Sequence, residues 1–337
     1  MIQQQISLKP YNTFAVNAVA SEFCEVASVN EVRMVLAQTQ YARNNILVLG
    51  GGSNVLFTKD YDGLVIRNVI KGIKRIRESD DQVWLEVGAG ENWHQFVMET
   101  LKRGYQGLEN LSLIPGCVGG APIQNIGAYG VEVATFIESL TAIKLADGSL
   151  FELTHDDCAF GYRDSVFKQA LKQQALINTV VFRLNKKPIL QIDYPALSDE
   201  LRHRHIHHPS AEIISDIVMN IRQKKLPDPK QLPNAGSFFK NPIIEKSQYA
   251  ALLKCFAQLP HYVVSDQKVK LPAAWLIDQC GFKGKRFNAV GVHVNQALVL
   301  VNYGEGTGGE IKALSEMIQN AVDARFSIQL EAEVNMI

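Results

Sequence analysis

The run of residues 46–57 (ILVLGGGSNVLF) constrains the fold most, because three consecutive glycines separate two apolar segments. Residues 46–49 have the composition of a buried strand, and glycines 50–52 can adopt positive φ and bring the backbone close to a ligand. Successive N–H groups in such a turn cradle an anion such as a pyrophosphate. A Rossmann fold or a P-loop would place a long helix directly after the glycines, which the apolar residues 55–57 do not predict. The run predicts either a dinucleotide-cofactor site outside those folds or a plain glycine-rich turn.

Two further glycine-rich connections favour the cofactor site. Residues 87–92 (VGAGEN) follow an alternating strand and precede a predicted helix that Gly104 ends. Residues 114–130 hold five glycines and two prolines among otherwise mainly apolar residues. A linker would be polar and solvated, so we expect this segment to pack where the backbone must come close, and a bound cofactor is the simplest reason.

The composition limits the classes of protein to which the chain can belong. The 337 residues are enough for two or three domains, and 47% hydrophobic against 20% charged residues excludes a disordered chain. Zero formal net charge gives no electrostatic reason to bind nucleic acid or a membrane. The five cysteines include no C-x-x-C pair, and neither a signal peptide nor a long apolar run is present. We therefore expect a cytoplasmic protein. A monomer is also expected, although not from the composition.

The order of predicted elements indicates an α+β fold. Residues 1–67 alternate strand and helix, with a capping-box pattern from Ser28 to Glu31, whereas residues 72–184 carry mainly short strands. A helix containing Ile213, Ile217 and Ile221 ends before the L-P-D-P sequence, a plausible domain boundary. Beyond it we predict helices near residues 273–280 and 311–322, a strand at 297–301 and a closing strand at 328–334. The expected domains are 1–67 with the terminal strand near 328–337, then 68–224, then 225–327.

Ser237 is a candidate proton donor. It lies in residues 234–242 (NAGSFFKNP), where two phenylalanines give its hydroxyl a partly apolar setting. A nucleophilic role is not favoured, because no Gly-x-Ser-x-Gly elbow surrounds it. The alternative is a serine that caps a turn, which this segment alone would favour.

Two charged residues are candidates to stabilise a developing negative charge. Arg163 has five donors suited to a carboxylate or an enolate, although an ion pair with Asp164 is the alternative. Alternation in the closing strand turns Glu333 away from the core. There it is either a solvated acid, which the sequence favours, or an acid beside a cleft.

A histidine run at residues 203–208 (HRHIHH) invites a metal hypothesis, since His203 and His207 would share a helix face. No carboxylate follows at ligand spacing, so a solvated loop is favoured and no metal is predicted. Scattered lysines suit a phosphorylated ligand, although most exposed lysines bind nothing.

Nine ordered segments closely resemble the UDP-N-acetylenolpyruvoylglucosamine reductase family over nearly the whole chain. They are residues 12–14 (NTF), 50–56 (GGGSNVL), 88–93 (GAGENW), 114–119 (IPGCVG), 122–130 (PIQNIGAYG), 160–165 (FGYRDS), 225–229 (KLPDP), 236–242 (GSFFKNP) and 275–280 (WLIDQC). The resemblance implies a three-domain flavoprotein, with an FAD-binding lobe of the vanillyl-alcohol oxidase type and a smaller α+β substrate-binding domain. It implies FAD and NADPH as cofactors and UDP-N-acetylglucosamine enolpyruvate as substrate.

The same resemblance implies roles for individual residues. Ser237 is the proton donor, and Arg163 and Glu333 stabilise the charge that hydride addition leaves beside the substrate carboxylate. The cofactor-binding residues are Gly50, Gly51, Gly52, Ser53, Asn54, Gly116, Gly119, Gly120, Gln124 and Gly127. The substrate-binding residues are Tyr194, Lys225, Asn241 and Gln296, with Tyr262, Lys270 and Lys283 on the phosphates. Tyr194 and its loop indicate the subtype with a substrate-covering tyrosine. Gly119-Gly-Ala121 and Glu331-Ala-Glu333 depart from the family pattern without removing a reacting group.

Two other functions explain part of the sequence. A flavin-dependent oxidase of the same cofactor fold would account for the first half equally well. A UDP-sugar-binding protein without catalysis is disfavoured by the presence of Arg163, Ser237 and Glu333.

Overall fold

The computed structural model describes residues 1–40 and 45–337, and these form two compact units. Unit 1 comprises residues 1–6, 19–52 and 61–224, whereas unit 2 comprises residues 7–18, 53–60 and 225–337. Both units are therefore built from segments that are distant in the sequence. The chain changes unit directly after the three glycines, so residues 53–54 belong to unit 2.

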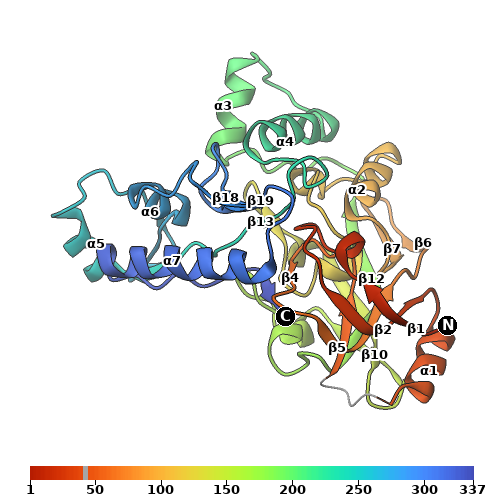
Figure 1. Cartoon of the computed structure of the whole chain (residues 1–337). Helices are drawn as coiled ribbons and strands as arrows, with labels where there is room; N and C mark the ends of the chain where they lie inside the picture. The colour runs from red at the N-terminus through yellow and green to blue at the C-terminus, as the bar shows by residue number, and fades with distance from the viewer. Residues whose placement is uncertain (41–44) are drawn as a thin grey trace. The chain divides into compact units, whose positions relative to one another are not determined.

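The first sheet of unit 1 has the strand order β1-β2-β5-β3, in which β2, β5 and β3 run parallel (Figure 1). Its strands are β1 (Gln3–Ser7), β2 (Val19–Val26), β5 (Tyr61–Asn68) and β3 (Ile46–Leu49). Helix α1 (Val29–Gln38) connects β2 to β3. The Ser28 side chain accepts the Glu31 N–H, as the capping-box pattern predicts, and Val32 and Val35 are buried.

The second sheet of unit 1 is antiparallel throughout, with the order β11-β10-β12-β7-β6. It contains β6 (Ile73–Glu78), β7 (Gln82–Gly88), β10 (Ile137–Lys144), β11 (Leu150–Thr154) and β12 (Ala175–Asn185). Helix α2 (Trp93–Lys102) contributes Trp93 and Phe96 to the core beside these strands. Gly104 follows α2 with φ +74°, so it ends the helix as predicted.

Two helices complete unit 1. Helix α3 (Pro195–His203) and helix α4 (Ala211–Lys225) bury Leu197 and Leu201 against Ile214, Ile217 and Val218. Because these apolar residues recur at helical spacing, the two helices form a small core of their own.

Unit 2 is built on an antiparallel sheet with the order β13-β19-β18-β17. Its strands are β13 (Asn234–Ser237), β19 (Val299–Asn302), β18 (Val290–Val292) and β17 (Arg286–Phe287). A second sheet has the order β14-β16-β15, from β14 (Ile243–Glu245), β16 (Lys268–Lys270) and β15 (Tyr262–Val263). The helices are α5 (Lys246–Leu253), α6 (Ala273–Gln279) and α7 (Gly308–Phe326).

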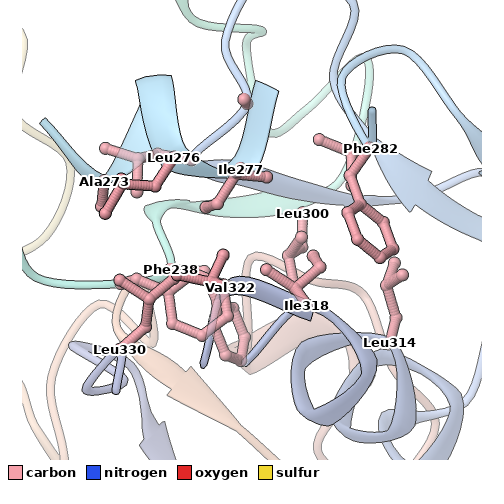
Figure 2. Close-up of a cluster of buried hydrophobic side chains, with 14 of the residues drawn as sticks. Phe238, Ala273, Leu276, Ile277, Phe282, Leu300, Leu314, Ile318, Val322 and Leu330 are labelled. Carbon is pink, nitrogen blue, oxygen red and sulfur yellow. The ribbon is translucent and has the colours of Figure 1, made fainter. Parts of the chain in front are cut away.

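The core of unit 2 lies between α6, α7 and β19. Figure 2 shows Leu314, Ile318 and Val322 of α7 facing Ile277 and Leu300. Thr307 and Glu310 form a complete capping box at the start of α7. The predicted period of α7 is therefore confirmed.

The closing segment forms less strand than its alternation predicts. Ile328, Leu330 and Val334 are buried as expected. Regular pairing is limited to a bridge between Ala332 and Phe239 and to β20 (Asn335–Met336), which runs parallel to β4 (Val55–Leu56). The alternation of side chains thus predicted correctly which of them are buried. It did not predict how much of the segment forms a strand, because the backbone pairs only where another strand lies beside it.

Candidate active site

The turn at residues 50–52 packs directly against a second glycine-rich turn in unit 1. A Cβ atom on Gly51 would lie 2.9 Å from Cα of Gly116, and one on Gly50 would lie 2.5 Å from Sγ of Cys117. Real Cβ atoms do not approach other atoms so closely. Gly50 and Gly51 are therefore required because the two turns touch.

Positive φ, the other reason expected for the three glycines, applies to Gly52 alone, at +62°. In the second turn, the Gly119 N–H donates to the Ala89 carbonyl oxygen at 2.8 Å, and a Cβ on Gly119 would lie 2.6 Å from Cβ of Ala89. A Cβ on Gly120, in contrast, would meet no atom within 4 Å. Gly120 therefore borders open space.

The open space at Gly120, beside turns whose main chains pack closely, is compatible with the pyrophosphate of a dinucleotide cofactor such as FAD. The predicted cofactor residues in unit 1 are Gly50, Gly51, Gly52, Gly116, Gly119, Gly120, Gln124 and Gly127, and those in unit 2 are Ser53 and Asn54. Residues 55–56 form the strand β4, so no long helix directly follows the glycines, as their apolar character indicated.

Arg163 is held by main-chain carbonyl groups. Its Nη2 donates to the Gly127 carbonyl oxygen at 2.5 Å and its Nη1 to that of Asn125 at 3.2 Å. Nη1 also lies 3.9 Å from a carboxylate oxygen of Glu132. The side chain is only 18% exposed, so the guanidinium has a fixed orientation.

A tight hairpin joins β8 (Gly127–Ala128) to β9 (Val131–Glu132) in unit 1. Its tip, Tyr129 and Gly130, has φ of +50° and +85°. The Tyr129 ring meets the Tyr194 ring edge-on, with centroids 5.4 Å apart and an interplanar angle of 74°. Burial raises the pKa of the Tyr129 hydroxyl, so it stays protonated at neutral pH.

Ser237 ends β13 beside an aromatic core. It pairs with Val299 and is half-buried, whereas Phe238 and Phe239 are fully buried with ring centroids 5.1 Å apart. Two buried aromatic residues thus follow the serine in the chain, and the partly apolar setting of its hydroxyl stays a prediction. Gly236, with φ +71°, turns the chain just before the serine.

Glu333 lies on the segment that runs beside Ser237. Its N–H donates to the Phe238 carbonyl oxygen at 2.8 Å, and its own carbonyl oxygen accepts the Asn54 side-chain amide at 3.2 Å. Glu333 is partly buried, whereas Glu331 is exposed and its carboxylate pairs with Lys240 at 2.5 Å. The sequence favoured an ordinary solvated acid at Glu333; the structure makes the residue partly buried, on a segment that returns along residues 238–240.

The predicted substrate-binding residues differ in exposure and in their hydrogen bonds. Tyr194 is 38% exposed and Lys225 is exposed at the end of α4. The Asn241 side-chain oxygen accepts the Ala273 N–H at 2.9 Å, at the start of α6. The Gln296 side-chain oxygen accepts the Leu298 N–H at 3.3 Å.

The predicted phosphate contacts lie on the smaller sheet of unit 2 and on the loop after α6. Tyr262 is 47% exposed and stands directly opposite Lys270 across β15 and β16. Lys283 lies 3.6 Å from the carboxylate of Asp278.

Two residues near the predicted site residues were not indicated by any sequence pattern. Buried Asn234 donates its amide to the carbonyl oxygens of Pro227 and Leu232 and accepts the Gly236 N–H, which fixes the approach to Ser237. Arg222, near the end of α4, has a solvent-inaccessible Nε that finds no hydrogen-bond partner in residues 1–40 and 45–337. No local motif marks either residue, because both depend on segments that fold back on them.

The histidine run does not assemble a metal site. Helix α3 ends at His203, so His207 does not share a helix face with it, and both side chains are exposed. Among residues 1–40 and 45–337, no group of three or more histidine, cysteine or acidic side chains is placed to hold a metal ion. In the same residues, no helix is long and apolar enough to cross a membrane.

Family models match both parts of the chain. The model described as "UDP-N-acetylenolpyruvoylglucosamine reductase, C-terminal domain" matches residues 228–337, and one described as "FAD binding domain" matches residues 20–154. The first match contains Ser237 and Glu333, and the second contains both glycine-rich turns.

Relatives match the chain over its whole length. A UDP-N-acetylenolpyruvoylglucosamine reductase from Flavobacterium johnsoniae is 48% identical over 100% of this chain and 99% of the relative. The protein of that name from Pseudomonas aeruginosa is 46% identical over 99% of this chain and 98% of the relative. The crystal structure of the Thermus caldophilus protein of the same name has a TM-score of 0.68 at 24% identity, covering 100% of this chain and 99% of that one. The last comparison shows a shared fold.

Proposed function

The chain belongs to the family of UDP-N-acetylenolpyruvoylglucosamine reductases, FAD-dependent oxidoreductases of peptidoglycan synthesis, and we propose that Ser237, Arg163 and Glu333 act on its substrate. The reaction is the NADPH-dependent reduction of UDP-N-acetylglucosamine enolpyruvate to UDP-N-acetylmuramate. When bound, FAD supplies the two-electron carrier between NADPH and the substrate. We propose that the glycine-rich turns and residues 53–54 hold it.

Ser237 supplies a proton in this proposal. Hydride addition to the enolpyruvyl double bond leaves negative charge on the carbon next to the carboxylate, and that carbon must then be protonated. The hydrogen bond from Glu333 to Phe238 supports the proposal most directly, since it keeps an acid and the serine on adjacent segments of unit 2. The buried aromatic neighbours of Ser237 limit the water that would compete for the charge.

Arg163 and Glu333 stabilise the developing charge. Carbonyl groups already orient the Arg163 guanidinium, so little reorganisation is needed when the enolate forms. Its several donors suit the two oxygens of a carboxylate. Glu333 is held in position through both its main-chain N–H and its carbonyl group.

The nucleotide part of the substrate is assigned to polar residues by the family pattern. These are Tyr194, Lys225, Asn241 and Gln296, with Tyr262, Lys270 and Lys283 on the phosphates. The pairing of Tyr262 with Lys270 supports this assignment, because it sets a hydroxyl beside a cation on one sheet.

An anaerobic visible spectrum of the purified protein tests the function. We expect NADPH to bleach the flavin bands and the enolpyruvyl sugar nucleotide to restore them. Recovery with oxygen but not with the sugar nucleotide would indicate an oxidase. A stable complex with the sugar nucleotide, without any flavin change, would indicate a binding protein.

We also propose the domain bounds, the oligomeric state and the cellular location of the enzyme. The flavin lobe divides into residues 1–67, with the terminal strand near 328–337, and residues 68–224, and the substrate domain spans residues 225–327. The protein acts as a cytoplasmic monomer without nucleic-acid or membrane partners. Light scattering at micromolar concentration and cell fractionation test these statements.

A further inference from the structure

Asn110 is a buried asparagine whose side chain joins two segments of unit 1. It is 1% exposed and lies in the short 3₁₀ helix η3 (Glu109–Leu111). Its Nδ2 donates to the Tyr129 carbonyl oxygen at 2.9 Å and to the Gln191 carbonyl oxygen at 2.8 Å. Both hydrogens of the amide are thus used, on residues 19 and 81 positions away in the sequence.

The surroundings of the Asn110 amide fix its orientation. Its Oδ1 is inaccessible to solvent and has no hydrogen-bond partner among residues 1–40 and 45–337. A flipped amide would set Oδ1 against two carbonyl oxygens, which only accept hydrogen bonds. Burial of an oxygen in this way is unfavourable, so the two donated bonds must outweigh it. Asn110 therefore satisfies two main-chain carbonyl groups at a cost to its own side chain.

Helix η3 gives Asn110 a rigid base. Leu111 is fully buried, and its carbonyl oxygen accepts the Nε1–H of Trp93 at 2.9 Å. The Glu109 carboxylate accepts the Gly107 N–H at 2.6 Å. Trp93 and Leu111 both belong to the core beside the antiparallel sheet of unit 1. Because Asn110 extends from this well-packed part of the unit, its hydrogen bonds restrain the two segments that they reach.

One restrained segment is the tip of the hairpin between β8 and β9. The ladder of this hairpin ends at Ala128 and Val131, so the two tip residues, Tyr129 and Gly130, pair with neither of its strands. A carbonyl group at such a tip needs a donor from elsewhere, and Asn110 provides one for Tyr129. The hairpin tip is therefore fixed from outside the hairpin.

The other restrained segment leads to Tyr194. Residues 186–193, between β12 and α3, form no helix or strand, so regular structure does not hold their carbonyl groups. Asn110 holds this segment at Gln191, three residues before the tyrosine. Two N–H groups in the first turn of α3 donate to the Tyr194 carbonyl oxygen at 2.9 and 3.0 Å. The main chain is thus held on both sides of the Tyr194 side chain.

A cavity of about 410 Å³ borders both restrained segments. Its lining includes Gly130 and Val131 from the hairpin, and Ile189 and Gln191 from the segment that follows β12. Side chains therefore do not fill the space on this side of the two segments. The hydrogen bonds of Asn110 supply a connection that packing does not provide there.

We propose, on the basis of the nucleotide contact assigned above to Tyr194, that Asn110 is a positioning residue that holds the Tyr194 side chain in its binding position. The amide ties the Tyr194 segment to Tyr129, whose ring meets the Tyr194 ring edge-on. A segment that is already ordered has lost conformational entropy that ligand binding would otherwise cost. Asn110 thereby raises the affinity for the nucleotide through Tyr194.

Titration of UDP into the holoenzyme, in a double-mutant cycle, tests this role. We expect Asn110→Ala to weaken UDP binding by about 5-fold to 50-fold, because two hydrogen bonds that order the segment are lost. Asn110→Asp is nearly identical in size and should weaken it at least as much, because a carboxylate cannot donate to the carbonyl groups. In the Tyr194→Ala protein, Asn110→Ala should have no added effect, since no ring is left to position.

Hydrogen exchange measures the segment directly in the ligand-free holoenzyme. We expect faster amide exchange over residues 189–194 in Asn110→Ala. Asn68→Ala is the matched control, because Asn68 is a buried asparagine of unit 1 whose side chain forms two hydrogen bonds, with Ile177 and Ile70. Its loss lowers stability without releasing the Tyr194 segment. Asn110→Ser, which keeps one hydroxyl donor, gives the same comparisons if the alanine variant does not fold.

Three results would overturn the proposal. The first is an unchanged UDP affinity in Asn110→Ala. The second is additive losses of affinity in the double variant, because Asn110 would then act independently of Tyr194. The third is equal exchange over residues 189–194 in Asn110→Ala and Asn68→Ala, which would make the effect one of general stability.

Failure of the proposed function is recognised separately in the wild-type protein, whose flavin would then not be restored by the enolpyruvyl sugar nucleotide. Unchanged UDP binding in Tyr194→Ala would remove the contact on which the role of Asn110 rests, and would refute both assignments. A wild-type enzyme that completes both half-reactions, with UDP affinity reduced in Tyr194→Ala but unchanged in Asn110→Ala, would refute only the role of Asn110.

Discussion

The main-chain N–H of Glu333 donates a hydrogen bond to the carbonyl oxygen of Phe238 over 2.8 Å, although the two residues are far apart in the sequence. The bridge between Phe239 and Ala332 continues this contact by one residue. The segment after α7 therefore returns along the one that follows Ser237. This return brings the two candidate residues of unit 2 into one neighbourhood.

Replacement of Ser237 by alanine should separate the two half-reactions. We expect flavin reduction by NADPH to be unchanged, and reoxidation by the enolpyruvyl substrate to be slower by about 100-fold to 10,000-fold, because only that step needs the proton. Anaerobic stopped-flow absorbance measures both rates. Ser198→Ala on α3 is the control, and normal reoxidation in Ser237→Ala would remove the serine from its role.

Replacement of Gly120 by alanine should weaken FAD binding without weakening the fold. An added Cβ meets no protein atom within 4 Å, and Gly120 does not have positive φ, so the protein itself accommodates it. We expect an unchanged melting temperature for the apoprotein and a higher Kd for FAD. Gly309→Ala is the control, because Gly309 lies in α7 with comparable space. Equal FAD affinity in both variants would place the cofactor elsewhere.

Replacement of Ile318 by alanine should destabilise unit 2. The side chain is fully buried in the cluster of Figure 2, so its truncation leaves a cavity. We expect a loss of about 2–5 kcal/mol in the free energy of unfolding, measured by urea denaturation. Met317→Ala changes the neighbouring residue, which is 47% exposed, and should cost far less. Similar losses for the two variants would contradict the assigned core.

The cysteines should differ sharply in alkylation. Burial raises the pKa of Cys24 to about 11 and that of Cys158 to about 12, whereas Cys255 is exposed. Because the thiolate is the reactive form and Cys255 is exposed, we expect modification of Cys255 well before the two buried thiols react. Peptide mapping after iodoacetamide treatment gives the order. Early loss of Cys24 or Cys158 in the native protein would show that these sites open.

Several features were predictable because they depend on neighbours in the sequence. The apolar period of α7 fixed its buried face, and the capping pattern at Ser28 fixed the start of α1. The glycine-rich segments indicated close backbone approach before the structure showed what they approach. The family resemblance rested on these same local motifs, and relatives over the full length of the chain confirm it.

The remaining features depend on contacts between distant segments. The sequence turned Glu333 away from the core but could not show that residues 238–240 would run beside it. Asn241 looks free in the sequence, yet its side-chain oxygen holds the start of α6. No pattern around Arg222 reveals that its Nε is inaccessible to solvent and has no hydrogen-bond partner among the described residues. By itself, the sequence determined the helices α1, α2, α4, α6 and α7, the glycine-rich turns and the family, because backbone geometry and periodicity are local. Only the tertiary structure decided which polar groups are buried, paired or left for a ligand, because burial and charge pairing are set by residues that folding brings together.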